Sequence, residues 1–269
     1  MKLVICEKPS VAKAVASALG VTSRADGCFE GNGLIVSWCV GHLVSPMDAA
    51  GYDLGYKKWK YDDLPILPEP FRYVLAKGKE DAFQNLKRLM DREDVTELVN
   101  ACDAGREGEL IFRLVYEMAG CRKPFSRLWI SSMEDAAIRE GFQNLRPGAE
   151  YDPLYQSALC RQKADWLIGI NATRLFSVLY HRTLNVGRVQ TPTLAMLVDR
   201  DWKISSFKKE KYHHVRLALD GAEAVSERIA SPEEAETLLN SLFLAGGLML
   251  SQVASLTGLE PYVIQNWVR

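Results

Sequence analysis

The sequence predicts an α/β protein in which a mainly parallel sheet is followed by a mostly helical region. Short apolar runs alternate with amphipathic segments up to about residue 147, a pattern typical of parallel strands joined by helices. Beyond residue 152, apolar residues recur at helical spacing through two long segments. This change of pattern places a domain boundary near residue 147.

The first strand is expected at residues 2–6, which form a short and almost wholly apolar run. Glu7 and Lys8 follow it, and a helix with Val and Ala at every third or fourth position then runs to Gly20. A carboxylate and an ammonium are therefore expected at the carboxyl end of a strand. Lys8 either pairs with Glu7 there or meets a phosphate.

The same patterns predict further strands and helices in this region. Two apolar runs on either side of the Gly-Asn-Gly turn at residues 31–33 indicate a hairpin, and His42 after it is interpreted as a loop residue. Residues 46–70 lack periodicity and are expected to form a long surface loop. The other predicted elements are strands at residues 71–75 and 126–131 and helices at residues 79–90 and 134–145.

An acidic loop follows the apolar run of residues 97–102. Asp103 comes first, and a glycine-rich turn leads to Glu107 and Glu109 at the start of a predicted helix. Ligands of open α/β sheets bind beyond the carboxyl ends of the strands, and carboxylate oxygens suit Mg²⁺ better than zinc. The loop therefore indicates a magnesium site, or else a set of acids that only complements the helix dipole.

Two helices are predicted in the second region, at residues 152–180 and at residues 191–201 after a turn. Arg161 and Asp165, four residues apart, lie largely off the apolar face of the first helix. Such a pair stabilises a surface helix by only about a few tenths of a kcal/mol, so a position in a groove explains it better. The turn at residues 183–193 has small, hydroxyl, Arg and Gln side chains, which indicate either a phosphate contact or an ordinary capped helix start.

Composition excludes several classes of protein. The chain has 269 residues, of which 48% are hydrophobic and 25% charged, as in ordinary globular proteins. It has no apolar run near about 18 residues and no leader sequence, so a cytoplasmic protein without a membrane segment is expected. Six cysteines without a Cys-x-x-Cys pair favour buried thiols over a zinc site. The net charge of −1 conceals a basic stretch, because Lys and Arg outnumber Asp and Glu by 12 to 6 between residues 146 and 216.

Four motifs together resemble one family, the type IA DNA topoisomerases, and within it the topoisomerase III branch. The motifs lie at residues 4–10, 102–109, 161–169 and 185–193, and the resemblance extends over residues 1 to about 207. It implies a Toprim domain, with a Rossmann-like mainly parallel sheet, followed by a helical domain that lines a DNA groove. The implied domains are Toprim at residues 1–147, the helical groove domain at 148–207, an incomplete hinge-like domain at 208–247 and a tail at 248–269.

The resemblance also implies an activity. The family cleaves one DNA strand by attack of a tyrosine on a phosphodiester, passes another strand through the gap and reseals it, which relaxes or decatenates DNA. The implied partner is mainly single-stranded DNA, and the implied cofactor is Mg²⁺, without a nucleotide cofactor. The implied metal ligands are Glu7, Asp103 and Glu107.

Other site residues follow from the same resemblance. Lys8 matches the lysine that contacts the scissile phosphate, while Arg161 and Asp165 match groove residues that orient DNA; Glu7, Lys8, Arg161 and Asp165 are therefore the expected catalytic set. The expected DNA-binding residues are Lys8, Arg161, Asp165, Arg174, Gly187, Arg188 and Gln190.

Two departures from the family pattern stand out. The common Asp-x-Asp-x-Glu motif has Gly105 in place of its second acid, and Glu109 is the spare carboxylate that would have to replace it. The catalytic tyrosine belongs to a Pro-Arg-Thr-containing motif that does not occur in this sequence, and none of its ten tyrosines has that context. The sequence is therefore expected to be an N-terminal portion that stops before the nucleophile.

The tail at residues 248–269 has a different resemblance. Its helix, glycine turn and second helix are similar to the start of a MerR-like helix-turn-helix, in which Gln265, Asn266 and Arg269 would read bases. An amphipathic helical hairpin that closes a core is the alternative.

Two further functions remain open at this point. The chain is alternatively a DNA-binding module built from the Toprim and helical domains, without cleavage. A third interpretation is another Toprim enzyme such as a primase or nuclease, but the motifs at residues 161–165 and 187–190 disfavour it. The expected location is the bacterial cytoplasm, in a nucleoid-associated or mobile-element context.

Overall fold

The computed structural model describes residues 1–219 and 222–246. It divides into two compact units, Met1–Met196 and Leu197–Arg269, and each is described here by itself. The predicted helix-turn-helix at residues 248–269 lies outside the described residues. No helix in the described part of the chain has the length and apolar character needed to cross a membrane.

A seven-stranded sheet organises the first unit, in the order β2-β3-β4-β1-β7-β8-β9. β1 pairs in parallel with β4 and β7, and β7 pairs in parallel with β8, whereas the two edges of the sheet are antiparallel. The strands are β1 (Lys2–Cys6), β2 (Ser23–Ala25), β3 (Cys28–Gly31), β4 (Leu34–Trp38), β7 (Glu97–Ala101), β8 (Phe125–Arg127) and β9 (Arg146–Pro147). The predicted α/β fold and the β3–β4 hairpin are confirmed.

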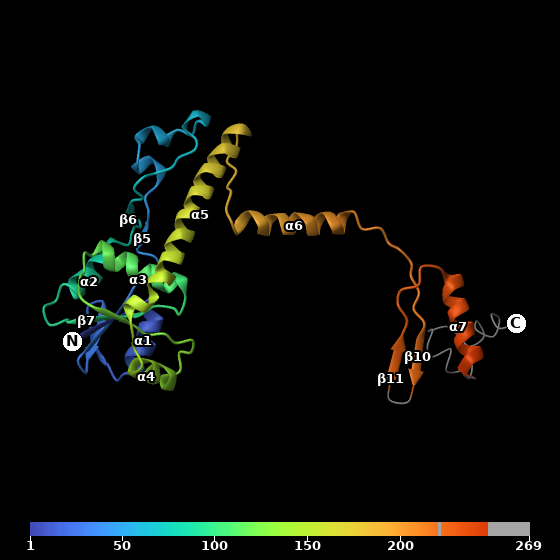
Figure 1. Cartoon of the computed structure of the whole chain (residues 1–269), viewed down its shortest axis with the longest axis horizontal. Helices are drawn as coiled ribbons and strands as arrows, with labels where there is room; N and C mark the ends of the chain where they lie inside the picture. Colours follow the sequence, from blue (N-terminus) through green and yellow to red (C-terminus); the bar gives the residue numbers. More distant parts are fainter. Residues whose placement is uncertain (220–221, 247–269) are drawn as a thin grey trace. The chain divides into compact units, whose positions relative to one another are not determined.

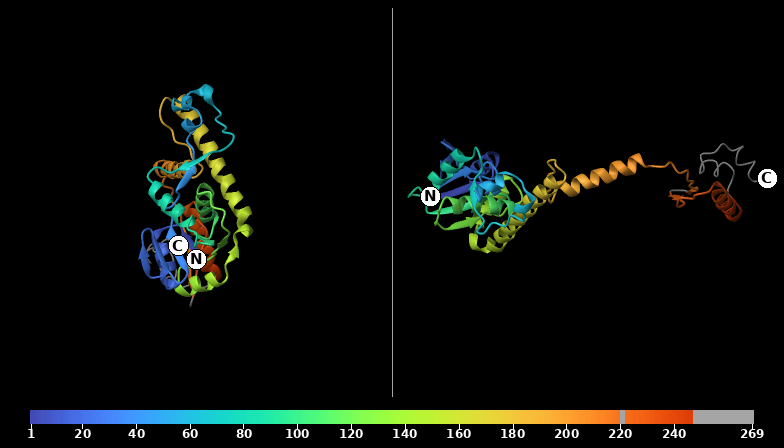
Figure 2. Two further views of the ribbon diagram at one scale, coloured as in Figure 1. Left: turned by 90° about the vertical axis from the view of Figure 1, so that its left-hand side faces the viewer. Right: turned by 90° about the horizontal axis from the view of Figure 1, so that it is seen from above.

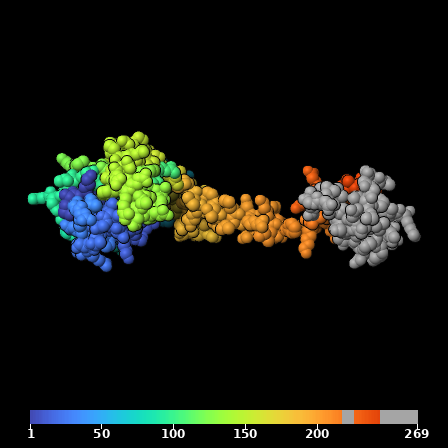
Figure 3. All heavy atoms as spheres, turned by 90° about the horizontal axis from the view of Figure 1, so that it is seen from below, coloured from blue at the N-terminus to red at the C-terminus, as the bar shows by residue number. Residues whose placement is uncertain are grey.

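Helices cover both faces of this sheet (Figure 1). They are α1 (Pro9–Ala18), α2 (Glu80–Met90), α3 (Arg106–Met118) and α4 (Asp135–Gln143). Alternate residues of β1 point to opposite faces, so Leu3 and Ile5 pack with α2 and α3 while Val4 and Cys6 pack with α1 and α4. Figure 3 shows the N-terminal residues and the residues near α4 as one continuous surface of this unit.

The predicted long loop leaves the sheet and returns to it through a small hairpin. β5 (Val44–Pro46) pairs with β6 (Tyr73–Leu75), so the strand expected at residues 71–75 is shorter than predicted and does not join the main sheet. Between them lie three 3-10 turns, η1 (Ala49–Gly51), η2 (Leu54–Lys57) and η3 (Tyr61–Asp63).

The long helix α5 (Asp152–Leu179) has Pro in its first turn, as predicted, after the short turn η4 (Gly148–Tyr151). The segment between β5 and β6 lies alongside its C-terminal half (Figures 1 and 2). Asn171 ties the two together, because its side chain both accepts from the Ile66 amide at 2.6 Å and donates to the Ile66 carbonyl at 3.0 Å. α6 (Gln190–Ser205) follows after a turn.

The second unit contains a hairpin and a helix. β10 (Arg216–Leu219) pairs antiparallel with β11 (Ala222–Val225), and α7 (Pro232–Gly246) follows. Val215 and Leu239 are buried within it. The region implied to be an incomplete hinge-like domain, residues 208–247, therefore contains a hairpin and a helix.

Candidate nucleic-acid and metal site

The parallel register brings the first two predicted acids together. Cys6 and Ala101 are paired at the ends of β1 and β7. Glu7 comes directly after Cys6, and Asp103 comes two residues after Ala101, so both acids lie at the same edge of the sheet. Burial, a hydrogen bond with the Asp103 carboxyl group and the charge of Asp103 raise the pKa of Glu7 above its ordinary value of 4.5. Two carboxylates held this close share a proton or a cation.

Lys8 lies next to this pair at the start of α1. Its ammonium is 3.7 Å from Glu7 Oε1, and its side chain is 55% exposed. An ion pair of this length at a surface contributes little to stability. The ammonium therefore keeps the freedom to meet a phosphate at the end of the strand.

Glu107 is directed to a different partner. Its Oε2 lies 3.4 Å from Nε2 of His42, and its side chain is 64% exposed. The sequence indicates His42 only as a loop residue, whereas the structure places its ring beside the Glu107 carboxylate. A histidine two residues after the apolar run that ends at Val40 was the signal that could have identified it, because β4 ends at the same edge as β1.

The donor set fits a cation held by two carboxylates rather than by three. In the described part of the chain, no group of three or more His, Cys, Asp or Glu side chains is placed to hold a metal ion. Mg²⁺ usually keeps several waters and takes only one or two carboxylates from a protein. Glu7 and Asp103 satisfy that requirement, because their carboxyl groups lie within hydrogen-bond distance of each other at the sheet edge.

The two glycines of the acidic loop differ in what surrounds them. A Cβ atom at Gly105 would meet nothing within 4 Å, so the missing acid of the family motif is not excluded by packing. A Cβ atom at Gly108 would lie 2.1 Å from the carbonyl oxygen of Asp103. Gly108 therefore allows the first turn of α3 to approach the loop.

Glu109 cannot replace the acid missing at Gly105, contrary to the possibility considered from the sequence. It is wholly buried, with Oε1 2.9 Å from Arg113 Nε and Oε2 3.1 Å from Arg127 Nε. The side chain of Asn100 also donates to its Oε2 at 3.0 Å. All of this places the Glu109 carboxylate beneath the loop and away from solvent.

Two of the predicted groove residues, Arg188 and Asp165, form an ion pair near the acidic edge of the sheet. Arg188 Nε is 2.7 Å from Asp165 Oδ1, so within the described residues Asp165 pairs with Arg188 rather than with Arg161 four positions before it. The hydrogen bond with Asp165 raises the pKa of Arg188, and the charge of Glu107 adds to the shift. Arg188 therefore interacts electrostatically with Glu107 of the sheet domain as well as with Asp165 of α5.

A cavity of about 230 Å³ joins these two sets of residues. Its charged and polar lining includes His42, Glu107, Arg161, Asp165 and Arg188. Residues from the loop after β4, from α3, from α5 and from the turn before α6 therefore face one space, although they are up to 146 positions apart in the chain.

The turn before α6 is held by hydroxyl groups. Thr173 Oγ1 accepts from the Val186 amide at 2.9 Å, and Thr191 Oγ1 accepts from the Gly187 amide at 3.0 Å. A Cβ atom at Gly187 would come no closer than 3.7 Å to Gln190. Packing alone therefore does not require this glycine, which leaves room for another group to approach.

Arg174 does not agree with the predicted role in DNA binding. It is 3% exposed, its Nη1 donates to the Tyr56 carbonyl at 2.9 Å, and its guanidinium lies 5.5 Å from the ring of Trp59. The side chain holds the segment between β5 and β6 against α5. Its periodic position on the helix could not reveal that partner.

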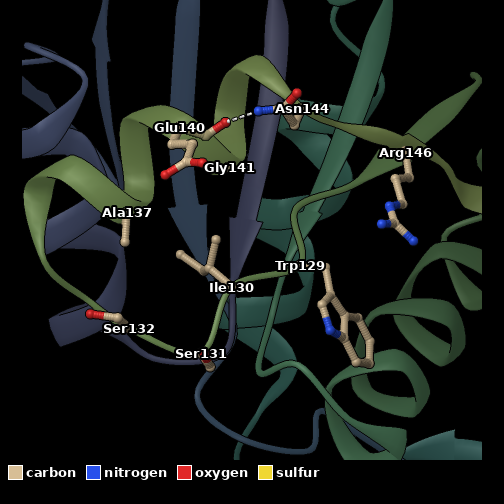
Figure 4. A pocket seen from close by; sticks show the side chains of 9 residues that line it. All are labelled: Trp129, Ile130, Ser131, Ser132, Ala137, Glu140, Gly141, Asn144 and Arg146. Atoms are coloured by element: carbon tan, nitrogen blue, oxygen red, sulfur yellow. Dashed lines mark hydrogen bonds between the residues drawn. The ribbon is translucent and has the colours of Figure 1, made fainter.

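A second cavity, of about 440 Å³, contains none of the predicted site residues (Figure 4). It lies between the end of β8 and α4, and Trp129 borders it beside the buried Arg127. Its lining comprises Trp129, Ile130, Ser131, Ser132, Ala137, Glu140, Gly141, Asn144 and Arg146.

Two family models and several known proteins are similar to this chain. A Toprim domain family model matches residues 2–133, and a DNA topoisomerase family model matches residues 149–257. The chain is 47% identical over 219 residues to DNA topoisomerase 3 of Bacillus subtilis, an alignment that covers 81% of this chain and 30% of the relative. The DNA topoisomerase 3 of Shouchella clausii is 43% identical over 249 residues, covering 90% of this chain and 34% of the relative.

The chain is therefore similar to part of the DNA topoisomerases. It spans about a third of the length of the curated relatives it matches. A solved structure, full-length topoisomerase I from Thermotoga maritima, has a TM-score of 0.57 at 23% identity, covering 94% of this chain and 45% of that one. At this identity the likeness concerns the fold.

Proposed function

We propose that this chain forms the Toprim and groove-lining parts of a type IA DNA topoisomerase and binds single-stranded DNA across the cavity that joins them. The proposal rests on one observation above all. Glu107 and His42 of the sheet domain line the same space as Arg161, Asp165 and Arg188. A phosphodiester there would lie between guanidinium groups and the acidic edge of the sheet.

Each set of residues has a distinct part in this proposal. Arg188 and Arg161 supply charge-assisted hydrogen bonds to the DNA backbone, and Lys8 meets the scissile phosphate at the end of β1. Glu7 and Asp103 would hold Mg²⁺, which when bound neutralises charge on the phosphate. Gly187 and Gln190 let the backbone of the turn approach the strand. The domains would be residues 1–147 for Toprim, 148–207 for the groove and 208–247 for the start of a hinge.

The complete cleavage and rejoining reaction also needs a nucleophile. In this family a tyrosine attacks the phosphodiester, and the covalent bond conserves the energy for resealing. The sequence has no tyrosine in the family context, and this favours a second candidate, in which the polypeptide binds DNA without cleaving it.

Binding is tested with a fluorescein-labelled single strand and a duplex of equal length, measured by anisotropy at two salt concentrations in EDTA. We expect tighter binding of the single strand, and weaker binding by R188Q with a salt slope reduced by about 0.7. R139Q, which changes an exposed arginine on α4 that also pairs with an aspartate, is the matched control. Equal affinity of wild type and R188Q would contradict the proposed groove.

Cleavage is tested separately with end-labelled single-stranded DNA and Mg²⁺, followed by denaturation. We expect no covalent adduct with this polypeptide alone. An adduct would show that a nucleophile is present in the chain and would exclude the second candidate.

A further inference from the structure

Arg127, the last residue of β8, has no exposed surface. Its guanidinium group donates hydrogen bonds to main-chain carbonyls, most of which lie where β7 leads into the acidic loop. Its Nη1 donates to the carbonyls of Asn100 at 3.0 Å, Cys102 at 2.7 Å and Leu128 at 2.8 Å. Its Nη2 donates to the carbonyl of Asp103 at 2.5 Å. One guanidinium group thus binds the main chain on both sides of the point where β7 becomes the loop.

The carbonyl of the buried residue Cys102 needs such a donor. β7 ends at Ala101, so the carbonyls of Cys102 and Asp103 lie beyond its ladder with β8. A buried carbonyl without a partner costs about 1–3 kcal/mol. Arg127 donates to both carbonyls with a planar group whose donors have fixed directions, which a lysine cannot do. The Asp103 carbonyl also accepts from the Gly105 amide at 2.8 Å, so two donors hold it.

Glu109 allows this arginine to be buried as a cation. Burial lowers the pKa of Arg127, and the nearby charge of Glu109 opposes that shift. The contact between Arg127 Nε and Glu109 Oε2 is an ion pair at 3.1 Å, and the Nε atom has no hydrogen-bond partner among the described residues. The guanidinium carbon lies 5.1 Å from the ring centroid of Trp129, a residue that also lines the cavity of Figure 4.

We infer that Arg127 is a positioning residue for the cation site: by holding the Asp103 carbonyl it keeps the Asp103 carboxylate beside Glu7. The inference rests on the proposed function, because it assumes that Glu7 and Asp103 bind a divalent cation. It adds a residue that touches neither DNA nor metal. Backbone fixed by Arg127 leaves the Asp103 side chain few ways to turn from Glu7, even though their charges repel.

Arg113 is the matched control for a purely structural role. It also pairs with Glu109 and is only 9% exposed, but its Nη2 binds the Gly148 carbonyl at 2.9 Å and Asp152 at 2.7 Å. Neither Gly148 nor Asp152 belongs to the acidic loop. If Glu109 merely needs a cation to keep the fold, then lysine at either position has the same consequences.

The experiment titrates the purified chain with MgCl₂ by calorimetry and measures unfolding by urea for wild type, R127K, R113K and E7Q. We expect E7Q to lose binding, R113K to bind as wild type does and R127K to bind about tenfold more weakly. This weakening should persist at a temperature where R127K and R113K have equal stability. Wild-type affinity in R127K, or equal losses in R127K and R113K, would overturn the inference.

A second variant covers the case in which R127K does not fold. R127M–E109Q removes both charges of the Arg127–Glu109 ion pair, so no carboxylate is left buried without its partner. The glutamine at position 109 can still accept a hydrogen bond from Arg113. This double variant should fold and still bind Mg²⁺ about tenfold more weakly than wild type. Undiminished binding would overturn the inference.

The DNA measurement in EDTA separates this inference from the proposed function. R127K should bind the labelled single strand as wild type does, because Arg127 is not in the groove. Absence of strand binding by wild type would refute the proposed function, whereas intact strand binding with unchanged Mg²⁺ affinity in R127K would refute only the role of Arg127. Mg²⁺ binding that is insensitive to E7Q would place the cation elsewhere and likewise overturn that role.

Discussion

The outer and inner sides of the first turn of α3 place two glutamate side chains in opposite environments, one exposed and one buried. On the outer side, the Glu107 carboxylate is 64% exposed and faces His42 and the cavity beside Arg188. On the inner side, the Glu109 carboxylate has no exposed surface and is enclosed by Arg113 and Arg127. Two residues along a helix correspond to about 200° of rotation, which is enough to separate a surface acid from a core acid.

The difference shows how the site is divided between chemistry and support. The outer acids and bases are partly solvated and can exchange partners with DNA or a cation. The members of the inner network are buried and bind one another and the main chain, so they act on the outer site only through the backbone. The predictions below test this division, from the largest expected effect to the smallest.

Removal of the inner carboxylate should have the largest effect on stability. We expect Glu109→Ala to lower the free energy of unfolding by about 3–5 kcal/mol, because it leaves two arginines around a buried site without their anion. Glu107→Ala should change it by less than about 0.5 kcal/mol, because that side chain is exposed. Urea unfolding measures both, and similar losses would contradict the division.

A methyl group should destabilise the chain at Gly108 but not at Gly105. Gly108→Ala would place a Cβ atom 2.1 Å from the Asp103 carbonyl oxygen, and we expect a loss of about 1–3 kcal/mol from overpacking. Gly105→Ala is the control, because its Cβ atom meets nothing within 4 Å. If the two variants unfold at the same urea concentration, the close approach of α3 to the loop is not needed.

Neutralisation of Glu7 should stabilise the chain in a pH-dependent way. The raised pKa of Glu7, caused first by burial and then by Asp103, means that the folded chain binds this proton more tightly than the unfolded chain. Glu7 therefore favours folding at low pH, and that contribution is lost as the pH rises through its folded pKa. Since glutamine resembles the protonated form, Glu7→Gln should be more stable than wild type at pH 7.

The stabilisation by Glu7→Gln should shrink as the pH falls and should vanish below the ordinary pKa of 4.5. Thermal unfolding in EDTA at a series of pH values provides the measurement. Glu150→Gln, at an exposed position, is the control and should show no such trend. A stabilisation that grows toward low pH would have the wrong sign for this pair.

Insertion of the missing acid should affect metal binding and leave stability almost unchanged. Gly105→Asp has open space for its side chain beside Asp103, so we expect tighter Mg²⁺ binding and a change in unfolding free energy within about 0.5 kcal/mol. Gly105→Asn is the matched control, since it has the same shape without the charge. Equal Mg²⁺ affinity in the two variants would mean that position 105 does not face the cation.

Much of the fold follows from local pattern. The continuous apolar run of β1 indicates a strand buried on both faces, and helical spacing in α1 and α2 identifies their buried sides. The parallel strands place Glu7 and Asp103 at one edge of the sheet. The strand predicted at residues 126–131 is shorter in the structure, where β8 spans Phe125–Arg127. Periodicity alone could not show that.

By itself, the sequence determined the α/β order and placed Glu7 and Asp103 after strands of one sheet, because apolar spacing and parallel pairing need only local information. The tertiary structure alone decided that Glu109 is buried, that Arg174 holds a loop and that Asp165 pairs with Arg188. In each case the deciding contact comes from a segment that the local pattern does not specify. A polar side chain has the same sequence signature in a groove, at a surface or in a core, and only its partners in space determine whether its charge is available for chemistry.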